Sequence, residues 1–190
     1  MEVSWDSLNA EIAACENCEL CRRIHHKVPG QGDAHARLML IGEGPGAEED
    51  MQGLAFVGAA GQLLTRMLAA IHLTREEVYI CNVVKCRPPM NRTPLPEEAE
   101  KCLPFLRRQF LLVRPKVIIL LGATAIKAVL GPEMRVTRDR GVWVERKGVF
   151  FMPTYHPAAL LRDESKKRDA WHDFQAVERK LREENGEGTD

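Results

Sequence analysis

A short apolar run that opens into a glycine-rich loop constrains this chain more than any other feature. Residues 38–41 are all apolar, and the loop that follows, Gly42–Asp50, contains three glycines and one proline and ends in three acids. An apolar strand that leads into such a loop is typical of the ligand-binding edge of an α/β sheet. Glycine allows close backbone approach there, and proline stiffens the turn. The loop is therefore predicted to form one wall of a binding site.

The bulk properties indicate one globular domain. The chain has 190 residues, of which 45% are hydrophobic, so we expect a domain over residues 1–184 and a disordered tail over 185–190. No apolar run approaches the ~18 residues of a membrane span, and the N-terminus lacks a secretory pattern, so we expect a cytoplasmic protein. Lys+Arg and Asp+Glu are both 27. This zero net charge argues against indiscriminate nucleic-acid binding but permits a local basic face.

Periodicity predicts strands that alternate with helices. The expected strands cover residues 38–41, 78–84, 116–122, 142–145 and 149–153, and the expected helices cover residues 5–14, 61–72, 96–112, 123–130 and 169–184. In the last helix, Trp171 and Phe174 are expected to face inward. The alternation predicts a three-layer α/β/α fold around a parallel sheet.

Six cysteines are many for a cytosolic chain of this size. They are Cys15, Cys18, Cys21, Cys81, Cys86 and Cys102. Without a secretory context, clustered cysteines more often bind metal than form disulfides, although a Cys-x-x-Cys pair can also be a redox dithiol. Four of them in two groups suit a tetrahedral metal site or an iron–sulfur cubane. Cys81 lies in a predicted strand and is expected in the core.

Three side chains fall where the ligand edge is expected. Phe56 stands between glycines, which suits stacking on a planar ligand, although it could plug the core. Asn82 interrupts an apolar strand, and its amide can match a nucleobase edge or close a turn. His156 follows a strand and precedes a proline. A lone histidine is more often structural, but its place on the same edge as Asn82 and Glu43 favours function.

Together, these motifs resemble the family 4 uracil-DNA glycosylases, which carry a [4Fe-4S] cluster. The resemblance spans roughly residues 8–181, and the motifs that carry it are Gly42–Asp50, Phe56–Gly58 with Gly61, Asn82 with Lys85–Pro89, and His156–Ala158 with Leu160–Arg162. It implies the uracil-DNA glycosylase fold, with a four-stranded parallel sheet. It also implies an enzyme that flips uracil out of DNA and hydrolyses the N-glycosidic bond, which leaves an abasic site.

The resemblance assigns the cluster to four cysteines, namely Cys15, Cys18, Cys86 and Cys102. Spacing alone leaves this assignment ambiguous, because Cys21 lies close to Cys18. The cluster would have a structural role. A zinc site of four cysteines in a structural or interaction module is the alternative from another functional class.

For the base itself, the resemblance implies a pocket that has the glycine-rich loop as one wall, with Gly42 and Gly44 as substrate-binding residues. Phe56 would stack on the uracil, Asn82 would read its O4 and N3–H edge, and His156 would stabilise negative charge at the O2 side. Relatives in other families place an Asp or Asn where this chain has Gly44. The orientation of the attacking water would then depend on a carboxylate. Glu49, held by Asn91, is the first choice, and Glu43 is the second. The missing Asp or Asn also leaves open a non-catalytic uracil-DNA binder.

For the DNA, the resemblance implies that Leu160, Leu161 and Arg162 enter the space that the base has left. Lys85, Arg87 and Arg92 would hold phosphates, so that binding weakens with salt. We expect a monomer that acts on single- or double-stranded DNA and does not bind a membrane. A sliding clamp is a candidate protein partner.

Overall fold

The computed structural model describes residues 3–186 and is built on a six-stranded sheet with the order β1-β3-β2-β4-β6-β5. The strands are β1 (Gln31–Gly32), β2 (Leu38–Gly42), β3 (Tyr79–Asn82), β4 (Val117–Leu121), β5 (Val144–Arg146) and β6 (Val149–Thr154). The central four, β3, β2, β4 and β6, are parallel, and β1 and β5 pair antiparallel at the two edges. The predicted four-stranded parallel sheet is confirmed, and the strand expected over residues 142–145 corresponds to β5, whereas β1 was not expected.

The predicted helices all occur, with ends shifted by at most two residues. The helices are α1 (Trp5–Ala14), α2 (Ala47–Gln52), α3 (Ala59–Ala70), α4 (Pro96–Val113), α5 (Ala123–Leu130), α6 (Val136–Asp139), α7 (Pro157–Arg162) and α8 (Lys167–Glu183). The sequence gives no range for α2, α6 and α7, because elements of four to six residues are too short for a helical period to be recognised.

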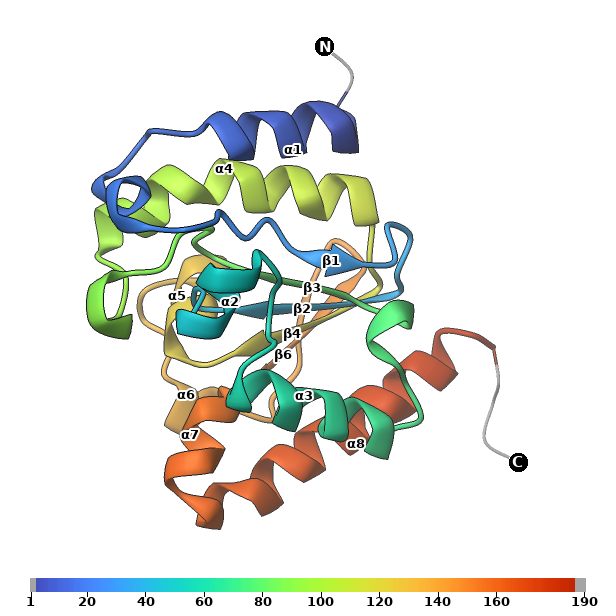
Figure 1. Cartoon of the computed structure of the whole chain (residues 1–190). Helices are drawn as coiled ribbons and strands as arrows, with labels where there is room; N and C mark the ends of the chain where they lie inside the picture. Colours follow the sequence, from blue (N-terminus) through green and yellow to red (C-terminus); the bar gives the residue numbers. More distant parts are fainter. Residues whose placement is uncertain (1–2, 187–190) are drawn as a thin grey trace.

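Helices cover both faces of the sheet, which confirms the three-layer fold. Figure 1 shows α1 and α4 on one side of the strands and α3 and α8 on the other. Successive side chains of a strand point to opposite faces. Met39 and Ile41 of β2 therefore join the cluster beneath α4 and α5, whereas Leu38 and Leu40 join the cluster beneath α3 and α8. Burial on both faces explains why β2 is a continuous apolar run rather than an alternating one.

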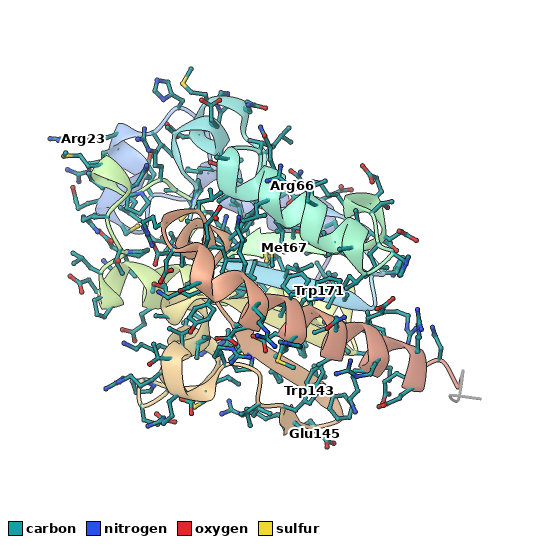
Figure 2. The ribbon with its side chains drawn as sticks, turned by 90° about the horizontal axis from the view of Figure 1, so that it is seen from below. Arg23, Arg66, Met67, Trp143, Glu145 and Trp171 are labelled. Atoms are coloured by element: carbon teal, nitrogen blue, oxygen red, sulfur yellow. The ribbon has the colours of Figure 1, made fainter. Side chains whose placement is uncertain are left out.

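Trp171 departs from its predicted inward orientation. Phe174 and Val177 of α8 are fully buried, as is Ala170, but Trp171 remains 37% exposed. Residue 171 lies about 100° around the helix from residue 170, which places it at the border of the buried stripe. Figure 2 shows Trp171 on α8 and Met67 on α3 along the face seen from below.

The predicted C-terminal tail is only partly described by the structure. Residues 187–190 of the predicted tail lie outside the described residues, whereas Asn185 and Gly186 form a turn after α8. The Asn185 side-chain oxygen accepts a hydrogen bond from Arg37. The domain boundary at residue 184 stays a prediction. Among residues 3–186, no helix is long and apolar enough to cross a bilayer.

The carboxyl ends of the four parallel strands lie along one edge of the sheet. Gly42 at the end of β2 is in register with Asn82 at the end of β3, and Leu121 of β4 is in register with Thr154 of β6. Each strand then opens into a loop at that edge. This arrangement brings together segments that are more than a hundred residues apart in the sequence.

Candidate active site

A cavity of about 660 Å³ opens at the carboxyl edge of the parallel strands. Each of the four loops that follow these strands contributes to its wall. The contributing segments are 43–49 after β2, Asn82 with residues 88 and 91–93 after β3, 121–123 after β4, and residues 155, 156, 158, 159 and 162 after β6, together with Phe56 and residues 58–60. The predicted ligand edge therefore carries a large concave site, which is the usual position for a binding site in such a sheet.

Gly42 is required because two side chains pack against its backbone. A β-carbon built there would lie 2.4 Å from Cζ of Phe56 and 2.5 Å from Oδ1 of Asn82. A β-carbon at Gly44 would lie 2.7 Å from Cγ2 of Val84. Both glycines thus serve close packing, and any larger residue at position 42 would displace the aromatic ring and the amide.

Phe56 is held in a left-handed backbone conformation, with φ 53°, and its side chain is buried. Its ring stacks on the ring of His156, with centroids 5.5 Å apart and an interplanar angle of 27°. The guanidinium of Arg75 donates to the carbonyls of Ala55 and Phe56 at 2.6 and 2.8 Å. Arg75 therefore fixes this loop. Sequence reasoning missed it because nothing local links residue 75 to a loop nineteen positions earlier.

Asn82 presents an unsatisfied acceptor at the sheet edge. The residue is 1% exposed, and its Oδ1 is a buried side-chain oxygen without a hydrogen-bond partner in the part of the chain that the structure describes. Buried polar atoms are nearly always hydrogen-bonded, because an unpaired one costs about 1–3 kcal/mol. An orphaned acceptor beside a cavity therefore indicates that a bound group supplies the donor.

His156 is held as a neutral imidazole. The backbone N–H of Ala158 donates to its Nδ1 at 3.0 Å, so Nδ1 carries the lone pair and the ring proton lies on Nε2. Burial of the ring lowers the pKa of His156 to about 4, and the positive charge of Arg162 adds to this, whereas Glu49 opposes it. At neutral pH the ring is an uncharged N–H donor.

Glu49 ties two glycine-rich loops together. Its Oε1 accepts from the backbone N–H groups of Val57 and Gly58 at 3.0 and 2.9 Å, and its Oε2 accepts from that of Gly46 at 3.1 Å. The described chain has no hydrogen bond between the Glu49 and Asn91 side chains, so support of Glu49 by Asn91 stays a prediction. In the described chain the Asn91 side-chain oxygen accepts from Nε of Arg87 at 2.7 Å instead.

Glu43 also lines the cavity and is held by a single hydroxyl. Thr124, in the first turn of α5, donates its Oγ1 proton to Oε2 of Glu43. Glu43, Glu49 and Asn91 thus all line the same cavity, although their hydrogen-bond partners come from different elements.

Two residues predicted to contact DNA are buried. Lys85 is 2% exposed, and its Nζ donates to the Asn82 carbonyl at 2.6 Å and to Oε1 of Gln109 at 2.7 Å. Leu160 is 1% exposed and packs with Leu63 and other core residues. Both predictions are corrected, because a phosphate or base cannot reach side chains that are already enclosed by the fold.

The other predicted DNA contacts lie at the surface. Leu161 is 45% exposed, and Arg162 is exposed and lines the cavity. Arg87 is half-buried beside Asn91. Arg92 lines the cavity while both of its terminal nitrogens bind Glu98, at 2.9 and 2.8 Å. These four residues remain predicted DNA contacts.

Replacement of Lys85 by methionine is expected to destabilise the fold. The unbranched apolar side chain is one atom shorter than lysine and leaves the acceptors on Asn82 and Gln109 without their donor, at about 1–3 kcal/mol for each. Urea denaturation measures the free energy of unfolding. Lys116→Met, at an exposed position, is the matched control. Equal stability of the two variants would contradict the structural role of Lys85.

Five of the six cysteines line a second, smaller cavity on the side of the sheet covered by α1 and α4. They are Cys15, Cys18, Cys21, Cys86 and Cys102, and none of them forms a disulfide in the described chain. Burial and the neighbouring thiols raise the pKa of Cys86 to about 12. The sixth, Cys81, is fully buried in the core, as predicted.

The thiol cavity does not have the geometry of a site for a single ion. Among residues 3–186, no three His, Cys, Asp or Glu side chains converge closely enough to hold one metal ion. Lys27 braces the rim of this cavity, since its Nζ donates to the carbonyls of Ala13 and Cys15. The sulfur atoms thus surround a space instead of meeting at a point.

Comparison with known proteins gives a consistent result. A sequence model described as the Uracil DNA glycosylase superfamily matches residues 29–175. A type-4 uracil-DNA glycosylase of Archaeoglobus fulgidus is 43% identical over 92% of this chain and 92% of its own length. One from Thermotoga maritima is 44% identical over 86% of both chains, and one from Sulfurisphaera tokodaii is 40% identical over 92% of this chain and 83% of its own.

Proposed function

The chain belongs to the type-4 family of the uracil DNA glycosylase superfamily, and from this premise we propose that it removes uracil from DNA. The reaction extrudes the base into the cavity and hydrolyses its N-glycosidic bond, leaving an abasic site. The observation that carries this function is the buried, unpaired Oδ1 of Asn82 beside the stacked rings of Phe56 and His156. A planar base that carries an N–H donor on its edge fits such a site.

Asn82 distinguishes uracil from cytosine by its fixed amide. Its free Oδ1 accepts the N3–H of uracil, and its amide nitrogen donates to O4. Cytosine has an unprotonated N3 and an amino group at these two positions, so both contacts become repulsive. Phe56 stacks on the base, and Gly42 allows the base to approach the sheet edge.

His156 stabilises the charge that develops when the bond breaks. The departing uracil becomes an anion, and the Nε2–H of the neutral ring donates to its O2 side. The nearby carboxylates also stabilise the positive charge that develops on the sugar carbon. Because its orientation is set by the backbone of α7, His156 needs no reorganisation to act.

Glu49 is our first choice to orient the attacking water, and Glu43 is the second. A carboxylate has about four lone-pair directions, and three N–H groups occupy three of them in Glu49, which leaves one for a water. Glu43 is held by one hydroxyl and is less restrained. Gly44 lacks a side chain and cannot take this role. Asn91 lines the same cavity and is a second group that can contact the water.

A single-turnover assay with a uracil-containing oligonucleotide tests the function. We expect stoichiometric abasic sites, detected as strand breaks after alkali, and none with a cytosine-containing control strand. Binding without abasic product would instead establish a non-catalytic uracil-DNA binder on the same fold. This alternative is kept because Gly44 stands where other families have a water-binding side chain.

The donor set of the thiol cavity fits an iron–sulfur cluster, and we propose a [4Fe-4S] cluster held by four cysteines. Two of them, Cys15 and Cys18, come from the N-terminal segment, and Cys86 and Cys102 come from the loop after β3 and from α4. A cubane holds its four thiolates farther apart than one zinc ion, whose Zn–S distance is ~2.3 Å. When bound, the cluster would cross-link the N-terminal segment to the sheet.

Replacement of Cys86 by serine is expected to abolish iron binding, because one of four thiolate ligands is lost. Iron and acid-labile sulfide analysis of the purified protein, with its visible absorbance, measures the result. Cys81→Ser is the control with a core cysteine and should retain iron. Cys21→Ser tests the assignment left open by spacing, since Cys21 also lines the cavity. A colourless wild-type protein with stoichiometric zinc would contradict the cluster.

The remaining partners stay predictions. We propose that DNA binds over Arg87, Arg92, Leu161 and Arg162, in single- or double-stranded form, with an affinity that falls as salt rises. A cytoplasmic location, at the nucleoid when DNA is bound, follows from this function. The monomeric state and a sliding clamp as partner are open to sedimentation and pull-down measurements.

A further inference from the structure

Met90 is a large apolar side chain held almost entirely in solvent. It is 95% exposed and lies in the short 3₁₀ turn Pro89–Asn91, between β3 and α4. Single exposed apolar residues are common on protein surfaces and need no explanation by themselves. The backbone of this turn and its position beside the cavity are the two further observations that matter.

The turn adopts a conformation that costs free energy. Met90 and Asn91 both have left-handed backbones, with φ 53° and 57°, and non-glycine residues adopt this region rarely. Two backbone hydrogen bonds maintain it, from the N–H of Asn91 to the Pro88 carbonyl and from the N–H of Arg92 to the Pro89 carbonyl, both at 3.1 Å. Strained backbone that the surroundings enforce is concentrated at functional sites.

Side chains on both sides clamp the turn. On one side, Nε of Arg87 donates to the Asn91 side chain at 2.7 Å. On the other, Arg92 forms a two-pronged ion pair with Glu98, whose carboxylate also caps the start of α4. The side chain of Met90 is therefore presented on a rigid support, although nothing in the described chain packs against it.

The turn lies at the mouth of the base cavity. Pro88 and Asn91, on either side of Met90 in the sequence, both line that cavity. Another part of the wall comes from α7, where exposed Leu161 adjoins the lining residue Arg162. Each of these two wall segments thus carries one exposed apolar side chain next to residues that line the cavity.

We infer that Met90 is a wedge that enters the base stack of double-stranded DNA beside the extruded uracil, an inference that rests on the proposed function. Extrusion of a base leaves an apolar gap, and proteins fill such gaps with inserted side chains that include methionine. A rigid turn loses little conformational freedom on insertion. The wedge opposes return of the base, so its contribution is confined to substrates in which uracil is stacked and paired.

Single-turnover cleavage on three substrates tests this wedge. With Met90→Ala we expect a rate roughly tenfold lower on a U·A duplex, equal to about 1.4 kcal/mol of the extrusion cost, and a smaller loss on a U·G mismatch. Cleavage of a single-stranded uracil oligonucleotide should stay at the wild-type rate, because no partner strand competes for the base. Met90→Leu should restore duplex cleavage by supplying another apolar side chain of similar reach.

Two controls separate the wedge from other effects. Leu111→Ala removes another exposed apolar side chain, 56% exposed, from a surface away from the cavity and should change none of the rates. Met90→Gly relaxes the left-handed backbone yet should show the same duplex defect as alanine. Unchanged duplex cleavage by Met90→Ala, or an equal loss on single strands, would overturn the wedge. Wild-type protein that cleaves no substrate at all would instead overturn the proposed function.

Discussion

Replacement of His156 by alanine is expected to lower single-turnover cleavage of uracil by about 10²–10³, the usual cost of removing one preorganised donor to a developing anion. The donor is the Nε2–H, which is fixed because the N–H of Ala158 occupies Nδ1. The ring contributes to the charged transition state far more than to the bound ground state, so DNA affinity should change little. Rapid-quench cleavage and fluorescence anisotropy measure the two quantities.

An exposed histidine provides the matched control for this variant. His72 lies on the surface after α3, and its side chain is hydrogen-bonded to Glu178. The His72→Ala variant should cleave at the wild-type rate. If His156→Ala also cleaved at the wild-type rate, the assignment of His156 as the anion-stabilising donor would be wrong.

The pH dependence of cleavage follows from the same ring. The pKa of His156 is lowered to about 4 by burial, so the active neutral form persists from alkaline pH down to that value. We expect no loss of rate from this group near pH 6.5, where an ordinary histidine titrates. Between about pH 4 and 6.5 the unfolded state binds more protons at this position, so its contribution to stability falls as pH falls through that window. Rate and stability measured from pH 4 to 8 test both statements.

Replacement of Asn82 by aspartate is expected to lower the preference for uracil over cytosine by about 1–3 kcal/mol, the discrimination that a two-point base contact supplies. A carboxyl group lacks the fixed donor and acceptor of the amide, because its proton can lie on either oxygen. In the buried position at the end of β3, it is desolvated and favours the protonated acid, which donates to N3 and accepts from the amino group of cytosine. Competition between uracil and cytosine oligonucleotides measures the ratio.

Two further variants test whether Asn82 recognises the edge of the base. Asn82→Ala removes both contacts and should reduce uracil cleavage without any gain for cytosine. Asn9→Asp makes the same chemical change at an exposed position of α1 and should leave the preference intact. An unchanged uracil preference in Asn82→Asp would remove Asn82 from base recognition.

The sequence predicted the elements of the sheet edge better than it predicted side-chain environments. Phe56, Asn82 and His156 were expected at the ligand edge, and the structure brings them to one cavity. This succeeded because parallel strands place their carboxyl ends together whatever the loops contain. Lys85 and Leu160 were both expected at DNA and are both buried.

These two errors share a physical cause. A lysine in a basic loop is expected to be exposed. The side chain of Lys85 instead donates a hydrogen bond to Gln109, which lies 24 residues later, on a helix. Leu160 and Leu161 are adjacent apolar residues in one short helix, and only packing against Leu63 decides which of them faces the core. Burial of a single side chain depends on contacts between distant segments, which a local pattern does not contain.

By itself, the sequence determined the three-layer fold, the family and the set of chemical groups, because these depend on periodicity, glycine positions and motif residues. Tertiary structure alone decided which nitrogen of His156 carries the proton, that Asn82 keeps a free acceptor, and that Glu49 clamps two loops. It also decided that the glycine-rich loop is floored by Phe56 and Asn82 packed on Gly42. Such properties arise where side chains from separate strands meet, and the physical reason is that hydrogen-bond partners and burial are set by distances in space.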